Sequence, residues 1–221
     1  MELVRLSPST LNLFADCGRC FWLHINKSIH RPSGPFPSLP GGMDNVLKPY
    51  YDKFRTSGKL PPEIEGKVEG KLFPDLAKIN RWRNWRTGLE YFDHERNAKL
   101  IGALDDLLLV DGGKYAPLDY KTRGSLIKDD SHTYYRLQLD LYALLLKENN
   151  LPPAPFGYLI FYSPKEVLEG ALTRFTVEPV KVGIDAEAGR AVFEKAIGVL
   201  KGEIPPHHSS CTYGLWQNGN F

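Results

Sequence analysis

The spacing of apolar and polar residues changes several times along the chain, and each change predicts a different element. An apolar run over 100–110 encloses two neighbouring carboxylates, and a second run over 114–122 follows the glycine pair 112–113. Two apolar runs joined by a Gly-Gly turn are typical of a β-hairpin. We therefore predict adjacent strands over 100–110 and 114–122, with acidic side chains inside them.

The clearest helix pattern lies over 133–149, where Leu137, Leu141, Leu144 and Leu145 recur at intervals of three and four. Further helices are predicted over 6–25, 43–56 and 185–201, and a helix is one of two interpretations of 71–86.

Strand patterns precede and follow that helix. A strand over 89–97 and the hairpin form a three-stranded meander, and an apolar strand over 156–162 returns over 171–182. This order of elements predicts an α/β (α+β) fold with a central mixed β-sheet flanked by helices. We expect one domain over 1–221. Its two parts are a mainly helical part over 1–88 and a core with a C-terminal tail over 89–221.

Composition narrows the class of protein. The chain has 221 residues, 42% of them hydrophobic, which is enough for the core of one domain. A formal net charge of +2 is too small to indicate a nucleic-acid partner, so a DNA site must rest on local charge. Because no apolar run reaches about 18 residues and the N-terminus lacks a signal-peptide core, we expect a cytoplasmic protein.

Asp119 and Lys121 carry the strongest candidate chemistry. Side chains two residues apart in a strand share one face, and Asp105 comes from the neighbouring predicted strand. Buried carboxylates are costly unless they are paired or bind a metal. Two carboxylates beside one ammonium suit Mg²⁺ or Mn²⁺, which activates water while the lysine stabilises the developing charge.

The alternative is an ordinary hairpin with solvated acids and one salt bridge. That interpretation suits Asp106 or Asp111 taken alone. The combined pattern favours the metal site.

Three motifs in order resemble those of the PD-(D/E)XK nuclease superfamily. The similarity is to its RecB-like branch, which includes AddB-type and CRISPR-associated adaptation nucleases. Gly102-Ala-Leu-Asp105 is similar to a Gly-x-x-Asp motif, and Asp119-Tyr-Lys-Thr122 to Asp-Tyr-Lys-Thr. Gln138-Leu-Asp-Leu-Tyr142 is similar to a Gln-x-x-x-Tyr motif on the following helix. The resemblance implies a restriction-endonuclease-like core.

The resemblance also implies roles for these residues. Asp105, Asp119 and the backbone carbonyl of Tyr120 would bind the metal, and Lys121 would be the catalytic lysine. The residues that would support the site or contact DNA are Gln138 and Tyr142.

Asp44 is a further candidate ligand. RecB-like nucleases carry a metal-binding histidine in a Gly-x-x-His-x-x-Leu segment, and Asp44 stands at that position in the stretch 41–47. A carboxylate can replace imidazole as a ligand of Mg²⁺ or Mn²⁺. Alternatively, Asp44 is an N-terminal helix residue favoured by the helix dipole. Lys48 follows one turn later and could reach the same site or a phosphate.

The N-terminal stretch 7–23 is similar to a signature of RecB-like nucleases, and Cys17 stands at its cysteine. Iron–sulfur members of the family hold a [4Fe–4S] cluster with three more cysteines near the C-terminus. Cys211 matches the first of these, but Gly214 stands at the second.

Two interpretations of the cysteines stay open. Cys17, Cys20 and Cys211 with His207 or His208 could form a Cys₃His zinc or cluster site. Alternatively, the cysteines are buried small hydrophobic residues, which is the interpretation we favour from the sequence.

Local positive charge and aromatic residues gather over 81–86, which includes Trp82 and Trp85. Such interleaving suits phosphate contact and base stacking. The spacing equally suits a helix whose two tryptophans pack together on the core. The candidate DNA-contacting residues are Arg81, Arg83, Arg86 and Arg123.

We therefore predict a Mg²⁺- or Mn²⁺-dependent deoxyribonuclease. Its expected action is that of an exonuclease on single strands or ends, in DNA repair, recombination or CRISPR adaptation. One alternative is a non-catalytic DNA-binding or assembly subunit that retains the fold, and another is a scaffold whose acids are surface charges. Because the sequence has no P-loop segment, any helicase or integrase partner would be a separate protein.

Overall fold

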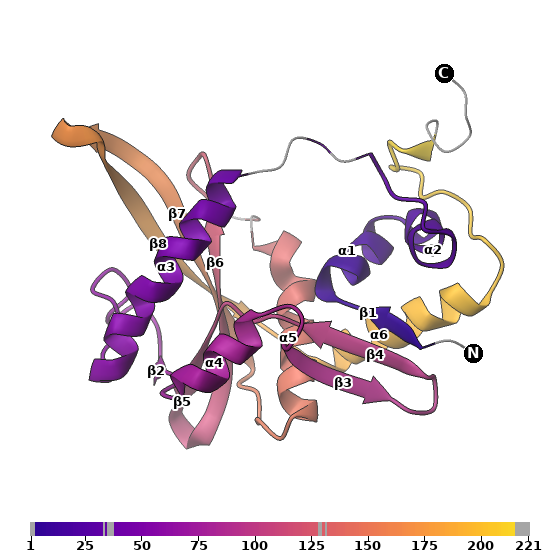
Figure 1. Ribbon diagram of the computed structural model, residues 1–221, viewed down its shortest axis with the longest axis horizontal. Coiled ribbons are helices and arrows are strands. Elements are labelled where there is room, and N and C mark those ends of the chain that lie inside the picture. Colours follow the sequence, from indigo (N-terminus) through magenta and orange to yellow (C-terminus); the bar gives the residue numbers. More distant parts are fainter. Residues whose placement is uncertain (1–2, 33, 35–37, 128–129, 131, 215–221) are drawn as a thin grey trace.

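Two β-sheets form the centre of the structure, a computed structural model in which residues 3–32, 34, 38–127, 130 and 132–214 are described. Helices pack on both sheets, and a long hairpin extends from the larger one (Figure 1). The mixed α/β architecture confirms the predicted fold class.

The smaller sheet has the strand order β1-β4-β3, with β1 (Val4–Leu6) parallel to β4 (Ala98–Gly102) and β3 (Leu89–Asp93) antiparallel to it. The larger sheet has the order β2-β5-β6-β7-β8, in which β6 and β7 are parallel and the other neighbours antiparallel. Its strands are β2 (Lys71–Leu72), β5 (Asp106–Val110), β6 (Lys114–Thr122), β7 (Phe156–Leu168) and β8 (Leu172–Gly183).

The prediction of a single strand over 100–110 is wrong. This stretch divides into β4, which ends at Gly102, and β5, which begins at Asp106, and the two strands belong to different sheets. β4 ends at Gly102, which lies against α5 (Arg136–Glu148): a Cβ at this position would lie 2.5 Å from Cδ1 of Leu145. The connecting segment 103–105 crosses from one sheet to the other, so the expected meander does not form.

The described helices largely follow the predicted patterns. They are α1 (Pro8–Asp16), α2 (Gly18–Lys27), α3 (Ser38–Ser57), α4 (Leu76–Arg83), α5 (Arg136–Glu148) and α6 (Ala186–Lys201). The helix predicted over 6–25 is broken at Cys17, whose backbone is extended, with φ −158° and ψ 111°. Among the described residues, no helix is long and apolar enough to span a bilayer.

The hairpin of β7 and β8 is longer than expected, because the chain reverses at 169–171 rather than over 163–170. Its outer part is exposed, as in Leu172 (67% exposed).

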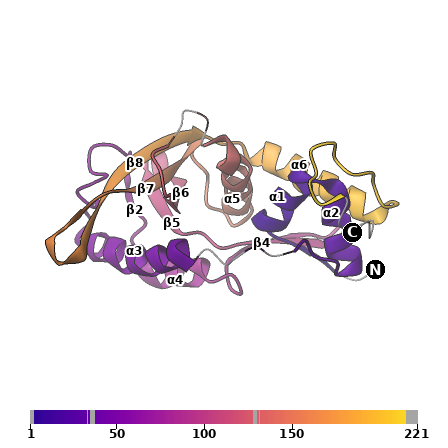
Figure 2. The same cartoon turned by 90° about the horizontal axis from the view of Figure 1, so that it is seen from above.

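Helices α3 and α5 pack against opposite faces of the larger sheet (Figure 2). On β6, Leu118 and Tyr120 join the core cluster that contains Leu47 of α3. On β7, Leu159 and Phe161 join the cluster that contains the leucines of α5. Because side chains alternate along a strand, Asp119, which lies between Leu118 and Tyr120 on β6, points toward α5.

Candidate active site

Asp119 and Lys121 of β6 lie on the α5 face of the larger sheet, as strand alternation predicts. Asp119 is 1% exposed, and its Oδ1 accepts a 3.0 Å hydrogen bond from Nε2 of Gln138 on α5. The ammonium of Lys121 forms an ion pair with the other carboxylate oxygen and donates to Oε1 of Gln138 at 3.2 Å. It also lies 4.6 Å from the ring centroid of Tyr135. One glutamine therefore orients both ionisable side chains.

Tyr142 connects this pair to the segment between the two sheets. Its hydroxyl accepts a 2.7 Å hydrogen bond from Gln138 and donates one of 2.7 Å to the carbonyl of Ala103. Gln138 and Tyr142 are four residues apart on one helix face, which is why one can bond the other. The motif therefore positions Asp105 relative to Asp119.

Asp105 occupies the bend just before β5, not the strand interior expected from the sequence. Its Oδ2 accepts a 3.2 Å hydrogen bond from the backbone N–H of Tyr120, and its Oδ1 lies 3.2 Å from Nζ of Lys48. Asp106 pairs with Leu118 in the sheet register, so Asp105 stands beside Asp119. The two predicted carboxylates are thus brought together.

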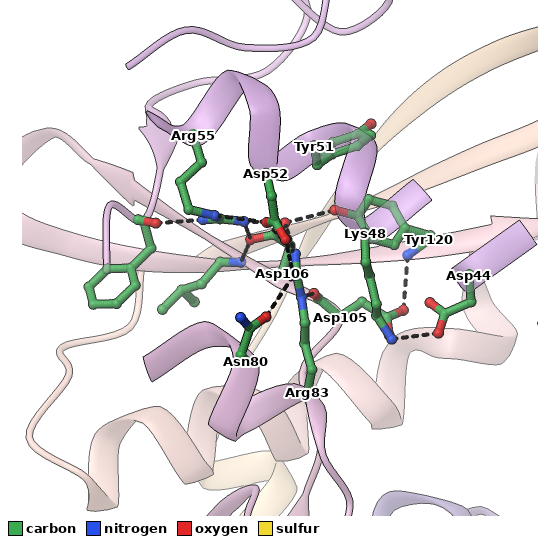
Figure 3. Close-up of polar contacts among 12 residues, drawn as sticks. Asp44, Lys48, Tyr51, Asp52, Arg55, Asn80, Arg83, Asp105, Asp106 and Tyr120 are labelled. Carbon is green, nitrogen blue, oxygen red and sulfur yellow. Dashed lines mark hydrogen bonds and ion pairs between the residues drawn. The ribbon is translucent and has the colours of Figure 1, made fainter. Parts of the chain in front are cut away.

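Asp44 and Lys48 of α3 lie next to Asp105 (Figure 3). Nζ of Lys48 lies 2.5 Å from Oδ2 of Asp44 and bridges this carboxylate to Asp105. A cavity of about 280 Å³ adjoins them, and Asp44, Lys121 and Tyr135 are among its lining residues. α3 therefore supplies a cation as well as the carboxylate named from the sequence.

Burial and neighbouring acidic groups raise the pKa of both carboxylates. Burial, followed by the nearby charge of Asp105, raises the pKa of Asp119 from an ordinary 3.8 to about 7, although Lys121 acts in the opposite direction. Burial also raises the pKa of Asp105, against the attraction of Lys48. A divalent cation between two such groups would favour their charged forms and lower both pKa values.

Asp105 and Asp119 fit a small hard cation. Oδ2 of Asp119 is buried and, within the described residues, has no hydrogen-bond partner, although it faces Lys121. Mg²⁺ is commonly bound by one or two carboxylates with water completing the shell. Asp44 does not form a tight three-carboxylate cluster with them in the described chain, and it is paired with Lys48 instead.

A buried ion cluster next to this site was not expected from the sequence. Asp106, treated there as a solvated acid, is 0% exposed. Both its oxygens accept 2.7 Å hydrogen bonds from Nη2 of Arg55, and Oδ2 also accepts from Arg83 at 3.0 Å and from the Tyr120 hydroxyl at 2.7 Å. Asp52 completes the cluster with bonds of 2.7 and 3.0 Å from Arg83. Two acids and two arginines balance in charge (Figure 3).

Arg83 therefore differs from its expected role as an exposed DNA contact. Its side chain is 8% exposed, and its Nε donates a 2.8 Å hydrogen bond to the carbonyl of Asp105. The sequence did hold a signal for the cluster. On α3, Asp44, Lys48, Asp52 and Arg55 follow one another at intervals of four, four and three, which places four charged residues on one helix face.

The other basic candidates are more accessible. Arg81 and Arg86 are exposed, and the Arg86 guanidinium lies 4.3 Å from the ring centroid of Trp85, which is 67% exposed. The two tryptophans do not pack together, because α4 ends at Arg83, and Trp82 packs on Phe73 instead.

Arg123 and the cysteines are the remaining candidates from the sequence. Arg123 follows the end of β6, with its guanidinium 6.0 Å from the ring of Phe161. Cys17 and Cys20 are buried at the start of α2, and Sγ of Cys211, from the segment after α6, lies 3.5 Å from that of Cys20.

Comparison with protein families matches residues 43–217 to the PD-(D/E)XK nuclease superfamily. The match includes Asp105, Asp119 and Lys121. No curated protein matches the chain. Among solved structures, the chain is similar to that titled "Crystal structure of SSO0001", at 16% sequence identity and a TM-score of 0.45. The alignment covers 90% of this chain and 78% of that chain.

Asp106→Ala is expected to destabilise the fold by about 3–5 kcal/mol, because it leaves two buried arginines without their shared carboxylate. Urea denaturation measures the change. Asp111→Ala removes an exposed carboxylate from the turn five residues later and should cost less than about 0.5 kcal/mol. Similar small losses for both variants would contradict a central role for the cluster.

Asp119→Asn is expected to change how the stability of the metal-free protein depends on pH. Between about pH 4 and about pH 7, folded Asp119 keeps a proton that the unfolded chain has released, so wild-type stability falls as pH rises. The Asp119→Asn variant has no proton to release at this position, so its stability does not fall for this reason as pH rises. Denaturation in EDTA should therefore favour the variant more at about pH 8 than at about pH 5, and an equal difference at both values would refute the assignment.

Proposed function

Since the chain belongs to the PD-(D/E)XK nuclease superfamily, we propose that it is a metal-dependent deoxyribonuclease that hydrolyses phosphodiester bonds. The observation that carries the proposal is the convergence of Asp105, Asp119 and Lys121, from two segments of the chain, beside one cavity. The motifs around them resemble those of RecB-like nucleases.

The two carboxylates hold the metal in this proposal, together with the backbone carbonyl of Tyr120. When bound, Mg²⁺ or Mn²⁺ lowers the pKa of a coordinated water and polarises a phosphoryl oxygen. Lys121 places its ammonium where negative charge develops on the phosphate. Gln138 fixes this ammonium against Asp119, and Tyr142 fixes Gln138, so both are positioning residues.

The surface around Trp85 supports a nucleic-acid substrate. Arg5, Trp85 and Arg86 line a cavity of about 520 Å³. An exposed indole beside a guanidinium suits stacking of an unpaired base next to a phosphate contact. We therefore assign Arg81, Arg86 and Arg123 to DNA contact and favour single strands or ends, as in exonuclease action. A role in repair, recombination or CRISPR adaptation, with a helicase or integrase as a partner, is part of this proposal.

A second candidate function is a DNA-binding or assembly subunit without catalysis. The observation in its favour is the position of Lys48, whose ammonium contacts both Asp44 and Asp105. A lysine there competes with a metal for the carboxylate of Asp105. The pairing of Asp119 with Lys121 supports the nuclease instead.

Asp119→Ala and Lys121→Ala should each lower DNA cleavage by at least about 100-fold, because one removes a ligand and the other the charge that stabilises the transition state. End-labelled single-stranded DNA, double-stranded DNA and RNA, with Mg²⁺ or Mn²⁺, measure the rates and the preferred end. Asp111→Ala, in the exposed turn of the same hairpin, is the matched control and should cleave normally.

Cleavage that survives both changes would show that another site, or a contaminant, is responsible. DNA binding by the wild type without any cleavage would support the second candidate.

Trp85→Ala and Arg86→Ala should each weaken binding of single-stranded DNA by roughly tenfold, since a stacked base contributes about 1–3 kcal/mol. Arg86→Ala should also lower the slope of log affinity against log salt by about one. Fluorescence anisotropy measures the affinity and its salt dependence, and EDTA removes the metal so that the DNA is not cleaved. Arg174→Ala removes an equally basic residue from the exposed hairpin, where it pairs with Glu166, and should bind like the wild type. Equal weakening by Arg86→Ala and Arg174→Ala would show that the loss of positive charge is nonspecific and would contradict a DNA contact at Arg86.

A further inference from the structure

Three cysteines and one histidine that the proposed reaction does not use meet between α2 and the segment 202–214. Cys17 lies in the break before α2 and Cys20 in its first turn, each 1% exposed. Sγ of Cys20 is 3.5 Å from Sγ of Cys211. A ring nitrogen of His207, Sγ of Cys17 and Sγ of Cys211 all lie within 4.8 Å of one another. Three potential metal ligands from two distant segments therefore form one close group, and Cys20 adjoins this group through Cys211.

His207 is the histidine whose ring lies in this group. Both its ring nitrogens are buried and, among the described residues, lack a hydrogen-bond partner. A buried imidazole without a partner is costly, and a metal would satisfy it. His208, in contrast, is exposed, and its Nδ1 lies 2.7 Å from the hydroxyl of Ser210. The geometry distinguishes the two histidines that the sequence left equivalent.

We propose that Cys17, Cys20, His207 and Cys211 bind one Zn²⁺ ion in a tetrahedral structural site. Zinc lies about 2.3 Å from thiolate sulfur, so two sulfurs of one tetrahedral ion are about 3.8 Å apart. The 3.5 Å between Cys20 and Cys211 is close to this separation. A single ion fits such sulfurs better than a [4Fe–4S] cluster, in which each thiolate binds a different iron and the sulfurs lie farther apart.

The charges around the site favour a thiolate-rich ion. Three thiolates and Zn²⁺ leave one net negative charge, and Nη2 of Arg31 lies 3.9 Å from Sγ of Cys211. The guanidinium of Arg31 is held by an ion pair with Asp16 and by the ring of Tyr213, 4.5 Å away. The N-terminus of α2 adds a positive partial charge at Cys17 and Cys20.

The ion would hold the segment after α6 against the N-terminal helices. In the described chain, a few partly exposed side-chain hydrogen bonds also join α2 to this region and to the end of α6. They are those from Arg19 to Pro205, from Trp22 to Gly202 and from Asn26 to Leu200. A site with four protein ligands and no open position is structural rather than catalytic. Zinc therefore adds stability here without taking part in DNA cleavage.

The first test is metal content and cobalt binding of the full chain. Purified protein should contain one thiolate-bound zinc per chain. Metal-free reduced protein with Co²⁺ should show the intense visible bands and sulfur-to-cobalt charge transfer of a tetrahedral thiolate site. The same spectrum is expected for Asp119→Asn, which separates this site from the carboxylates, where oxygen ligands give weak bands. Iron with sulfide, a Cys20–Cys211 disulfide in the freshly reduced protein, or no tetrahedral spectrum would overturn the proposal.

The second test uses matched histidine variants. His207→Ala should weaken zinc binding by more than about 100-fold, beyond the 10–100-fold typical of groups that only orient a ligand. His208→Ala should bind zinc like the wild type. His207→Cys should restore binding with a shifted cobalt spectrum, which shows that loss in His207→Ala is not misfolding. Normal binding by His207→Ala, or loss in His208→Ala, would refute the assigned ligand.

Discussion

The ion cluster around Asp106 is the interaction on which the rest of the site depends. It joins α3, α4 and β5 through Arg55, Arg83 and Asp52, and Asp106 and Arg55 at its centre are fully buried. Its charges balance, so the assembled cluster is tolerated, whereas loss of one member leaves a buried charge without a partner. Because Arg83 also donates to the carbonyl of Asp105, the same cluster fixes the backbone that carries a proposed metal ligand.

The two faces of strand β6 carry different side chains. Its Leu118 and Tyr120 side chains pack toward α3, and Asp119 and Lys121 face Gln138 of α5. The Tyr120 hydroxyl bonds Asp106 on one side of the sheet, and its backbone N–H bonds Asp105 at the edge of the other. Neighbouring acids therefore have different roles: Asp106 binds arginines in the core, and Asp105 lies beside Asp119. A shift of one residue in the register of β5 against β6 would exchange the positions of Asp105 and Asp106.

Two groups of ligands of different chemistry lie in separate parts of the fold. Hard oxygen ligands gather where β5, β6 and α3 meet, and sulfur with imidazole gathers between α2 and the segment after α6. Oxygen sites suit Mg²⁺ or Mn²⁺, and thiolate sites suit zinc, so each group selects its own metal. In our proposals, this difference lets one chain use one ion for hydrolysis and another to stabilise its tail.

The sequence by itself determined the helices, the β5–β6 hairpin, the mixed α/β class and the shared face of Asp119 and Lys121, because periodicity and strand alternation are local properties. Tertiary structure alone decided that 100–110 divides between two sheets, since β4 pairs with β1 and β5 pairs with β2, and these partners are far away in the chain. It also decided the partners of Asp106, Arg83 and Lys48, and it distinguished His207 from His208. Those outcomes depend on distances between segments, which no local pattern encodes.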